Sequence, residues 1–366
     1  MKSLAAAGAV VASVFAVAAP AAAHVRGDSP AIFVQTNALD GNAVVAYDSH
    51  LQPAGTYRTG GKGGALDGAV VDRLASQGSV TLDRAHGLLY AVNAGSDTIT
   101  VFGVHGTELH KLQVIGSGGA FPVSVAVHGD LVYVLNARDG GSVQGFRRLG
   151  ARLVRVPQWH RRLGLDPAAT PEFTHTPGEV AVSPDGRQLL VTTKANTHAV
   201  DVFALDAYGT PAAAPTVNVL DGDVPFAVAF DKAGHLAVAE AGPNAVAAFD
   251  LRRNGTIAEL GSAATGGAAT CWIVYARGTY YVANAGSATI SIHRPDRSGG
   301  LTTIGTTGTD GGPVDLAVSG DGNHLYVQTG AEGRVNAFAI GADGSLTADG
   351  SVTVPNSTGG EGIAAS

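Results

Sequence analysis

Apolar residues alternate with small or polar residues along this chain in short segments, and turns separate the segments. Two of the clearest examples are LYAVNAGSDTITVF at 89–102 and YYVANAGSATISIH at 280–293. Each contains an apolar segment, a turn of Asn, Gly and Ser, and a second alternating segment. This pattern predicts two β-strands joined as a hairpin, in which Asn and Gly supply the tight turn.

The hairpin pattern recurs along the chain. The residue that opens its turn is Asn37, Asn93, Asn136, Lys194, Glu240, Asn284 and Thr329 in successive copies. The spacing is about 45 residues, apart from two longer steps that contain insertions. Another strand signal precedes most copies, as in PFAVAF at 225–230, and a fourth often follows, as in SLTADGSVTV at 345–354. Four strands per repeat predict an all-β protein, a seven-bladed β-propeller of four-stranded antiparallel blades.

The first copy lacks the strand signal that precedes the others, whereas GGEGIAAS at 359–366 looks like that missing strand without a continuation. We therefore predict that the C-terminal strand pairs with the N-terminal strands. Such pairing closes the ring and leaves no exposed sheet edge at the junction.

The beginning of the chain predicts export. Lys2, an apolar run over 4–18 and the small-residue ending APAAA at 19–23 are typical of a secretory signal peptide, and the run is too short to span a membrane. We expect 1–23 to be removed and 24–366 to form a single propeller domain outside the cytoplasm. The lone Cys271 cannot form an intramolecular disulfide, so the core must hold the fold.

Composition narrows the possible partners. The net charge of −7 and the pI near 5.9 provide no basic surface for nucleic acid. No further long apolar stretch predicts a membrane span. Metal-ligand, haem, Walker and nucleophile-elbow motifs are missing from the sequence, so we expect no metal and no cofactor. We expect a monomer that binds a small-molecule or carbohydrate-like ligand.

The central channel of a propeller is where a functional site is expected. The residues predicted to begin the innermost strands form one column: Ser79, Ser124, Glu179, Ala227, Trp272, Asp315 and Gly362. A purely structural repeat would fill this column with similar residues. Instead it holds two acids and a tryptophan, and the neighbouring turn column adds Lys194 and Glu240.

Several side chains in these columns are candidates for chemistry. Glu179, Glu240 and Asp315 are candidate acids or bases, because carboxyl groups in a narrow channel can have raised pKa values. Alternatively, they accept hydrogen bonds from backbone amides or bind channel water. Lys194 either stabilises an anionic substrate or pairs with a neighbouring carboxylate. Trp272 either stacks on a ring of the ligand or packs into the channel wall.

The remaining candidates come from the columns and from the insertions. Ser124, Asn93, Asn136 and Asn284 are candidate substrate contacts, although the two NAGS asparagines also fit a structural turn. The insertions, at roughly 57–77 and 157–176, both precede an innermost strand, which places both on the same rim. The first contains a segment with the composition of a short helical turn, and the second contributes Arg161 and His175. They are either lids and substrate walls or decoration of the rim.

The blade phrases LLYAVNAGSDTITVF and NHLYVQT, with the SPDG turn at 183–186, resemble those of the lactonase family of seven-bladed propellers. That family is named for 6-phosphogluconolactonase-like and carboxymuconate-cyclising members, and this chain is similar to its exported actinobacterial branch. The resemblance implies a catalytic His at the start of an inner strand, an Arg near the start of the next blade and a Glu in that blade's turn. Glu240 matches the Glu position. Phe226 or Ala227 stands at the Arg position and Gly178 or Glu179 at the His position, with His175 close but displaced.

Two functions from different classes remain open. As an enzyme, the protein would open or form a cyclic ester in the channel, with Glu240 or Glu179 moving the proton and Lys194 or an insertion arginine stabilising the oxyanion. As a non-catalytic module, it would use Trp272 and the insertions to hold a small molecule, a glycan or a protein on the rim. The family resemblance favours the first function, and the departures from the catalytic pattern favour the second.

Overall fold

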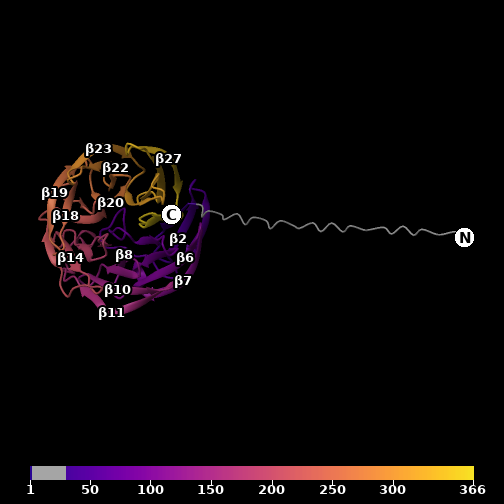
Figure 1. Cartoon of the computed structure of the whole chain (residues 1–366), viewed down its shortest axis with the longest axis horizontal. Helices are drawn as coiled ribbons and strands as arrows, with labels where there is room; N and C mark the ends of the chain where they lie inside the picture. Colours follow the sequence, from indigo (N-terminus) through magenta and orange to yellow (C-terminus); the bar gives the residue numbers. More distant parts are fainter. Residues whose placement is uncertain (2–29) are drawn as a thin grey trace.

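The computed structural model describes Met1 and residues 30–366, so the predicted signal peptide lies outside the described residues. The described chain forms seven four-stranded antiparallel sheets arranged in a ring (Figure 1). This confirms the predicted seven-bladed propeller. None of the helices within the described part is long and apolar enough to cross a membrane.

Each blade runs from an innermost strand at the channel to an outermost strand at the periphery. From inside to outside, the blade that holds both ends of the ring contains β28 (Ile363–Ala365), β1 (Ala31–Gln35), β2 (Ala43–Asp48) and β3 (Pro53–Arg58). The second blade contains β4 (Val80–Asp83), β5 (Leu88–Asn93), β6 (Thr98–His105) and β7 (Glu108–Gly116). The third contains β8 (Pro122–His128), β9 (Leu131–Asn136), β10 (Ser142–Leu149) and β11 (Arg152–Arg162). The fourth contains β12 (Val180–Val182), β13 (Gln188–Thr192), β14 (Ala199–Ala204) and β15 (Thr216–Val219).

The fifth blade contains β16 (Pro225–Phe230), β17 (Leu236–Glu240), β18 (Ala245–Leu251) and β19 (Ile257–Ala264). The sixth contains β20 (Thr270–Ala276), β21 (Thr279–Asn284), β22 (Thr289–Pro295) and β23 (Leu301–Gly308). The seventh contains β24 (Pro313–Val318), β25 (His324–Thr329), β26 (Arg334–Ile340) and β27 (Leu346–Thr353). A short 3-10 turn, η1 (Ala94–Ser96), and a one-turn helix, α1 (Glu172–His175), complete the described elements.

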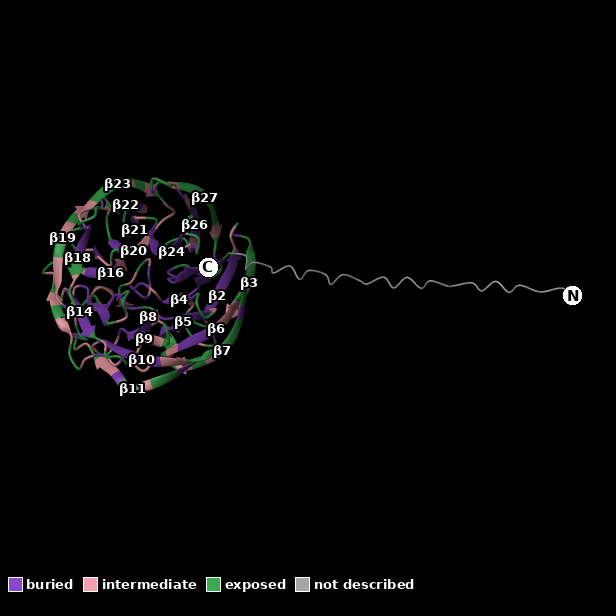
Figure 2. Ribbon diagram, in the orientation of Figure 1, coloured by how far each residue is buried: buried purple, intermediate pink, exposed green. Residues whose placement is uncertain are grey.

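Burial follows the position of a strand within its blade. The second strands carry apolar sequences, such as TYYVAN in β21, which is buried along its whole length. The outermost strands consist mostly of exposed and partly buried residues, as in β23 and β27. Figure 2 shows this gradient from the buried inner strands to the exposed periphery. The core therefore lies between neighbouring blades, where the apolar faces of adjacent sheets pack together.

The ring closes through the C-terminal strand, as predicted. β28 pairs antiparallel with β1, with Ile363 opposite Val34 and Ala365 opposite Ile32. Beyond the paired residues, the backbone amide of Ala31 donates to Ser366 Oγ at 2.8 Å. β28 thus supplies the innermost strand of the blade that contains β1–β3.

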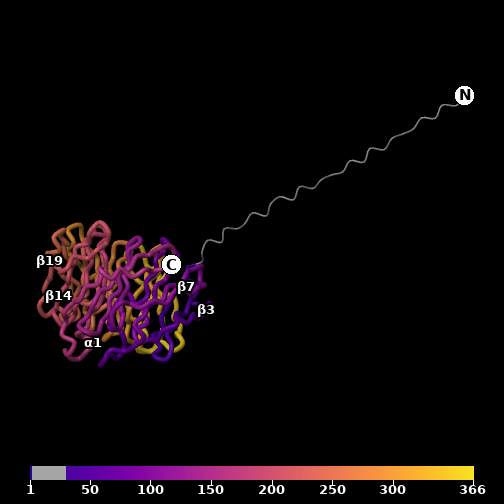
Figure 3. Tube along the Cα trace, turned by 90° about the horizontal axis from the view of Figure 1, so that it is seen from below, coloured from indigo at the N-terminus to yellow at the C-terminus, as the bar shows by residue number. Residues whose placement is uncertain are grey.

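The two insertions differ in structure from each other. The first, between β3 and β4, consists of turns and bends, so the helical turn considered for it is absent. Part of the predicted second insertion, Pro157–Arg162, belongs to β11, and the rest carries α1. In the side view of Figure 3, α1 lies at one rim of the ring.

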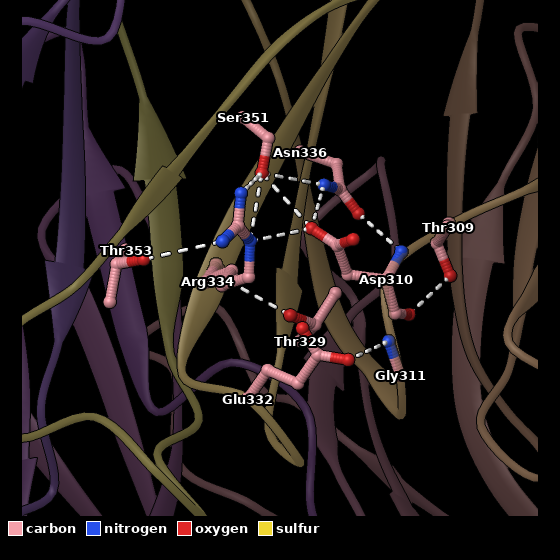
Figure 4. Close-up of polar contacts among 9 residues, drawn as sticks. All are labelled: Thr309, Asp310, Gly311, Thr329, Glu332, Arg334, Asn336, Ser351 and Thr353. Carbon is pink, nitrogen blue, oxygen red and sulfur yellow. Dashed lines mark hydrogen bonds and ion pairs between the residues drawn. The ribbon is translucent and has the colours of Figure 1, made fainter.

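A polar cluster fixes the loop that leads into β24 (Figure 4). Asp310 Oδ2 accepts hydrogen bonds from Arg334 Nε and Asn336 Nδ2, both at 2.7 Å, and from Ser351 Oγ at 3.0 Å. These donors lie on β26 and β27, so the cluster ties the loop to the outer half of its own blade. The tied loop includes Gly312, which faces the first insertion.

Candidate functional site

The first insertion enters the central channel. We name residues 66–77 the plug, because this segment reaches the starts of the innermost strands of several blades. Ser76 Oγ lies 2.9 Å from the carbonyl oxygen of Val123 on β8, and the Gln77 amide donates to the carbonyl of Gly178, just before β12, at 3.1 Å. Residues 74–77 are buried. The first insertion is therefore more than decoration of the rim, because its second half occupies the channel.

The mouth of the channel is shaped to receive the plug. A Cβ atom at Gly330 would lie 1.6 Å from the carbonyl oxygen of Val71, so the backbones approach as closely as only glycine permits. Gly312 also contacts Val71. On the far side of the mouth, the amide of Asp67 donates to Glu172 Oε2 of α1 at 2.7 Å. The plug thus spans the mouth before it turns inward.

Trp272, a predicted ligand platform, contacts the plug. Its indole Nε1 donates to the carbonyl oxygen of Ser76 at 2.6 Å, and its ring packs edge-on against Phe226 with centroids 5.0 Å apart. Only 3% of Trp272 is exposed. Both the polar and the apolar parts of this side chain are therefore occupied by the protein itself.

Lys194 connects the two insertions. Its ammonium group donates to the carbonyl of Ala75 in the plug at 2.7 Å, and to the carbonyl of Phe173 at 2.6 Å and Thr176 Oγ1 at 3.1 Å in the second insertion. Burial lowers the pKa of Lys194 to about 7, and the nearby Asp72 carboxylate opposes this shift. The sequence predicted either an anionic substrate or a neighbouring carboxylate as the partner of Lys194. Instead, its ammonium group donates mainly to backbone carbonyls.

Glu179 also faces the plug. The Val228 amide donates to its Oε2 at 2.7 Å, and Gln77 Nε2 lies 3.3 Å from its Oε1. Burial raises the pKa of Glu179 to about 8, and the neighbouring Asp315 adds to the shift. Burial therefore opposes ionisation of this carboxyl group, whereas the hydrogen bonds from Val228 and Gln77 favour the carboxylate.

Asp315 belongs to a group of buried acids in the channel. Its carboxylate accepts hydrogen bonds from the amides of Leu316 at 2.9 Å and Ile363 at 3.2 Å, and burial raises its pKa to about 7. Asp72 of the plug and Glu361 before β28 are the other two members. Burial raises the pKa of Asp72 to about 6 and that of Glu361 well above its ordinary value.

Glu240 differs from the other acids because no side chain or backbone group in the described structure is hydrogen-bonded to its carboxyl group. It ends β17, paired with Pro225 and Ala245. Only 4% of the residue is exposed, yet its oxygens are not among the fully enclosed unpartnered atoms, so water reaches them. Burial raises the pKa of Glu240 to about 8, and Asp223 and Glu259 contribute further.

The predicted polar contacts of the turn column serve the blades. Asn284 Oδ1 accepts from Thr270 Oγ1 at 2.6 Å, and Asn93 Nδ2 donates to Thr100 Oγ1 at 2.9 Å. Asn136 Nδ2 lies 3.5 Å from the carbonyl of Ser142. Ser124 Oγ accepts from the amide of Val180 and so joins neighbouring inner strands.

Arg161 and His175 lie apart from the channel candidates. Arg161 is on the outermost strand β11, where its Nε donates to the carbonyl of Ala212 at 2.6 Å. His175 ends α1, and its Nδ1 lies 2.9 Å from the carbonyl of Pro171. His175 lines a rim cavity of about 170 Å³ that also contains Arg138 and Glu172, which form an ion pair at 2.7 Å.

A second opening lies at the other end of the channel. All innermost strands start at the plugged end, and a cavity of about 380 Å³ is lined by their later residues, including Leu82, Phe230 and Tyr275. Gln77 forms its floor. No group of three or more His, Cys, Asp or Glu side chains in the described part is placed to hold a metal ion.

Sequence reasoning missed the four residues that meet at the centre of the channel: Asp72, Ser76, Gln77 and Glu361. One signal for them was present in the sequence: the predicted channel column contains two acids, and acids buried in a channel require hydrogen-bond partners. The polar residues of the first insertion were the nearest unassigned donors and acceptors in the sequence.

No protein-family model matches the chain, and no curated protein matches it. Solved structures do. A proposed 6-phosphogluconolactonase from Bacteroides fragilis is 17% identical with a TM-score of 0.72, covering 93% of this chain and 98% of its own. A periplasmic gluconolactonase from Pseudomonas aeruginosa is 17% identical with a TM-score of 0.73, covering 91% and 98%. A proposed 6-phosphogluconolactonase from Bacteroides uniformis is 16% identical with a TM-score of 0.74, covering 93% and 100%. At these identities the likeness establishes that this chain has the fold of those propellers.

Proposed function

We propose that this protein is a lactonase-like hydrolase that opens a cyclic ester, with Glu240 as its general acid. The observation that carries the proposal is the state of Glu240, a nearly buried carboxyl group reached by water and without a hydrogen-bond partner among the described residues. Its raised pKa of about 8 keeps it protonated at neutral pH. The fold shared with propellers named as lactonases supports the choice of ester.

The chemistry required of Glu240 is simple. Water attacks the carbonyl carbon of the lactone, and the carbon–oxygen bond of the ring then breaks. The ring oxygen leaves as a hydroxyl group after it receives the proton of Glu240, and the proton lost by the attacking water restores the acid. The products are a hydroxyl and a carboxylic acid within one molecule. Such proton transfer accelerates a reaction by roughly 10²–10⁴.

A second function is favoured by the plug. Residues 66–77 accept the indole N–H of Trp272 and one hydrogen bond of Lys194, two residues that the sequence offered as ligand contacts at the channel. A non-catalytic propeller with a filled channel would bind its ligand elsewhere. The rim cavity beside His175 and the Arg138–Glu172 ion pair is the position that this alternative uses.

A panel of lactones with different ring sizes and substituents tests the proposal. We expect wild-type protein to hydrolyse at least one of them and Glu240→Gln to lose at least tenfold in kcat/KM. Glu108→Gln, on the exposed strand β7, is the matched control and should retain full activity. Circular dichroism must show that both variants fold. Hydrolysis by Glu240→Gln at the wild-type rate would reject the role of Glu240, and no turnover of any lactone would favour the binding function.

Export is part of the same proposal and rests on the sequence of 1–23. N-terminal sequencing of protein recovered outside the cytoplasm should begin near His24. A cytoplasmic form that retains Met1 would contradict it.

A further inference from the structure

The hydroxyl group of Ser76 shows how the plug is held. Ser76 Oγ lies 2.9 Å from the carbonyl oxygen of Val123 and 2.9 Å from Glu361 Oε2. A hydroxyl group has one hydrogen to donate, and the Val123 carbonyl can only accept it. The contact with Glu361 is therefore satisfied when the Glu361 carboxyl group carries a proton and donates it to Ser76 Oγ.

The surroundings of Glu361 also favour a neutral carboxyl group. The residue is 0% exposed, and its other oxygen, Oε1, has no hydrogen-bond partner within the described chain. Burial and the charges of Asp72 on the plug and Asp315 on β24 all raise its pKa. The charge of Lys194 lowers the pKa of Asp72, but its own donors go to the two insertions.

We propose that Glu361 is a proton-dependent latch, which holds the plug in the channel while it is protonated and releases the plug when it ionises. Loss of the proton leaves the Ser76 hydroxyl with one hydrogen for two acceptors, the Val123 carbonyl and the Glu361 carboxylate, so one of the two contacts loses its hydrogen bond. Ionisation also places a third negative charge beside Asp72 and Asp315 in a region of low dielectric constant, where like charges repel strongly. Asp72 lies on the plug, so this repulsion acts directly on the moving segment.

The direction of the pH effect follows from the raised pKa of Glu361. An acid whose pKa is higher in the closed form stabilises that form fully below its ordinary pKa, near 4.5. The stabilisation is lost as pH rises through the raised pKa. The plug is thus closed in acid and opens as pH rises. An open plug uncovers Trp272 and Glu179, which then become accessible from the plugged end.

Hydrogen exchange of the full mature chain tests the latch. The amides of Leu74 and Ser76 bond to the Asp72 carboxylate, and that of Gln77 to Gly178, so they report directly on the plug. After correction for intrinsic exchange rates, the opening constant of wild type should rise by up to about tenfold per pH unit between the ordinary pKa, near 4.5, and the raised pKa of Glu361, and should level off above it. In Glu361→Gln the amide group can still donate to Ser76 but cannot ionise, so the rise should become smaller, and the remainder belongs to Asp72, Asp315 and Glu179, whose pKa values are also raised.

Fluorescence provides an independent measurement. In a Trp159→Phe background Trp272 is the single tryptophan, and its indole bonds to the plug. Acrylamide quenching should increase with pH when Glu361 is present and increase less in Glu361→Gln. Equal pH profiles for the two proteins would overturn the proposal, as would a wild-type profile that is flat from pH 5 to pH 9.

A second variant guards against failure of Glu361→Gln to fold. Asp315→Asn removes one of the repelling charges and so lowers the raised pKa of Glu361. The rise in opening should therefore level off at a lower pH and be smaller in total. An unchanged profile in this variant would also overturn the proposal. Glu108→Gln on β7 serves as the control, and its exchange profile should match that of wild type. These readouts do not depend on lactone hydrolysis, so the latch and the proposed function fail separately.

Discussion

The side chain of Gln77 forms two hydrogen bonds with the backbone of Ile273, which lies 196 residues later in the chain. Gln77 Nε2 donates to the Ile273 carbonyl at 3.1 Å, and Gln77 Oε1 accepts from the Ile273 amide at 2.9 Å. The carboxamide thus pairs with β20 as a neighbouring strand would. This pairing satisfies backbone groups of an innermost strand that has no neighbour on its channel side.

Gln77→Leu should destabilise the protein by about 2–4 kcal/mol, because the buried amide and carbonyl of Ile273 lose their partners. Urea denaturation measures the change in the free energy of unfolding. Gln158→Leu, at an exposed position of β11, is the matched control and should change stability by less than about 0.5 kcal/mol. Equal effects of the two substitutions would contradict the role of Gln77.

Lys194→Met should loosen both insertions together. The substitution leaves the buried carbonyl of Ala75 without this donor, at a cost of about 1–3 kcal/mol, and removes the donor to the partly buried carbonyl of Phe173. Hydrogen exchange should increase in 66–77 and in 163–176, while the blades stay protected. Lys232→Met, at an exposed turn, should change neither segment. Faster exchange confined to one insertion would show that Lys194 does not connect them.

Ile363→Ala should weaken the closure of the ring. Ile363 is buried and lies opposite Val34, so loss of its side chain should cost about 2–5 kcal/mol. Ile304→Ala, on the outermost strand β23, removes the same atoms from a site that is 38% exposed and should cost less than about 1 kcal/mol. Thermal unfolding compares the two. A larger loss at Ile304 would argue against closure through β28.

The proposed acid predicts how hydrolysis depends on pH. The protonated form of Glu240 is the active form, and its pKa is raised to about 8. After subtraction of spontaneous hydrolysis, kcat/KM should be constant below this pH and fall about tenfold per pH unit above it. Activity that increases through pH 8 would instead identify Glu240 as a base. Glu108→Gln should have the wild-type profile.

The fold was predictable because each blade repeats the same local pattern of apolar and polar residues. Hairpins such as 89–102 each specify strands and a turn, and their number and spacing specify the blades. The position of 359–366 in the first blade followed from the one missing strand. Glu240 at the end of a middle strand, and the Glu179–Trp272–Asp315 column at the starts of inner strands, were also located correctly from the repeat.

The plug was not predictable in this way, because it does not repeat. Asp72, Ser76 and Gln77 have no periodic pattern, and Ser76 and Gln77 contact groups far away in the sequence, at Glu361 and on β20. The same is true of Lys194, whose acceptors are backbone carbonyls of any residue type. Contacts of this kind depend on the path of an irregular segment through three-dimensional space, which alternation of apolar and polar residues does not encode.

The pairing of β28 with β1 also sets the order of events during synthesis on the ribosome. β1 is made early, yet its inner edge stays unpaired until residues 363–365 have emerged. Glu361 is made equally late, so Ser76 in the plug lacks its contact with the Glu361 carboxyl group until that residue has been synthesised. Six blades can form in sequence as they are translated, whereas closing of the ring and seating of the plug are both completed by the same final stretch of chain.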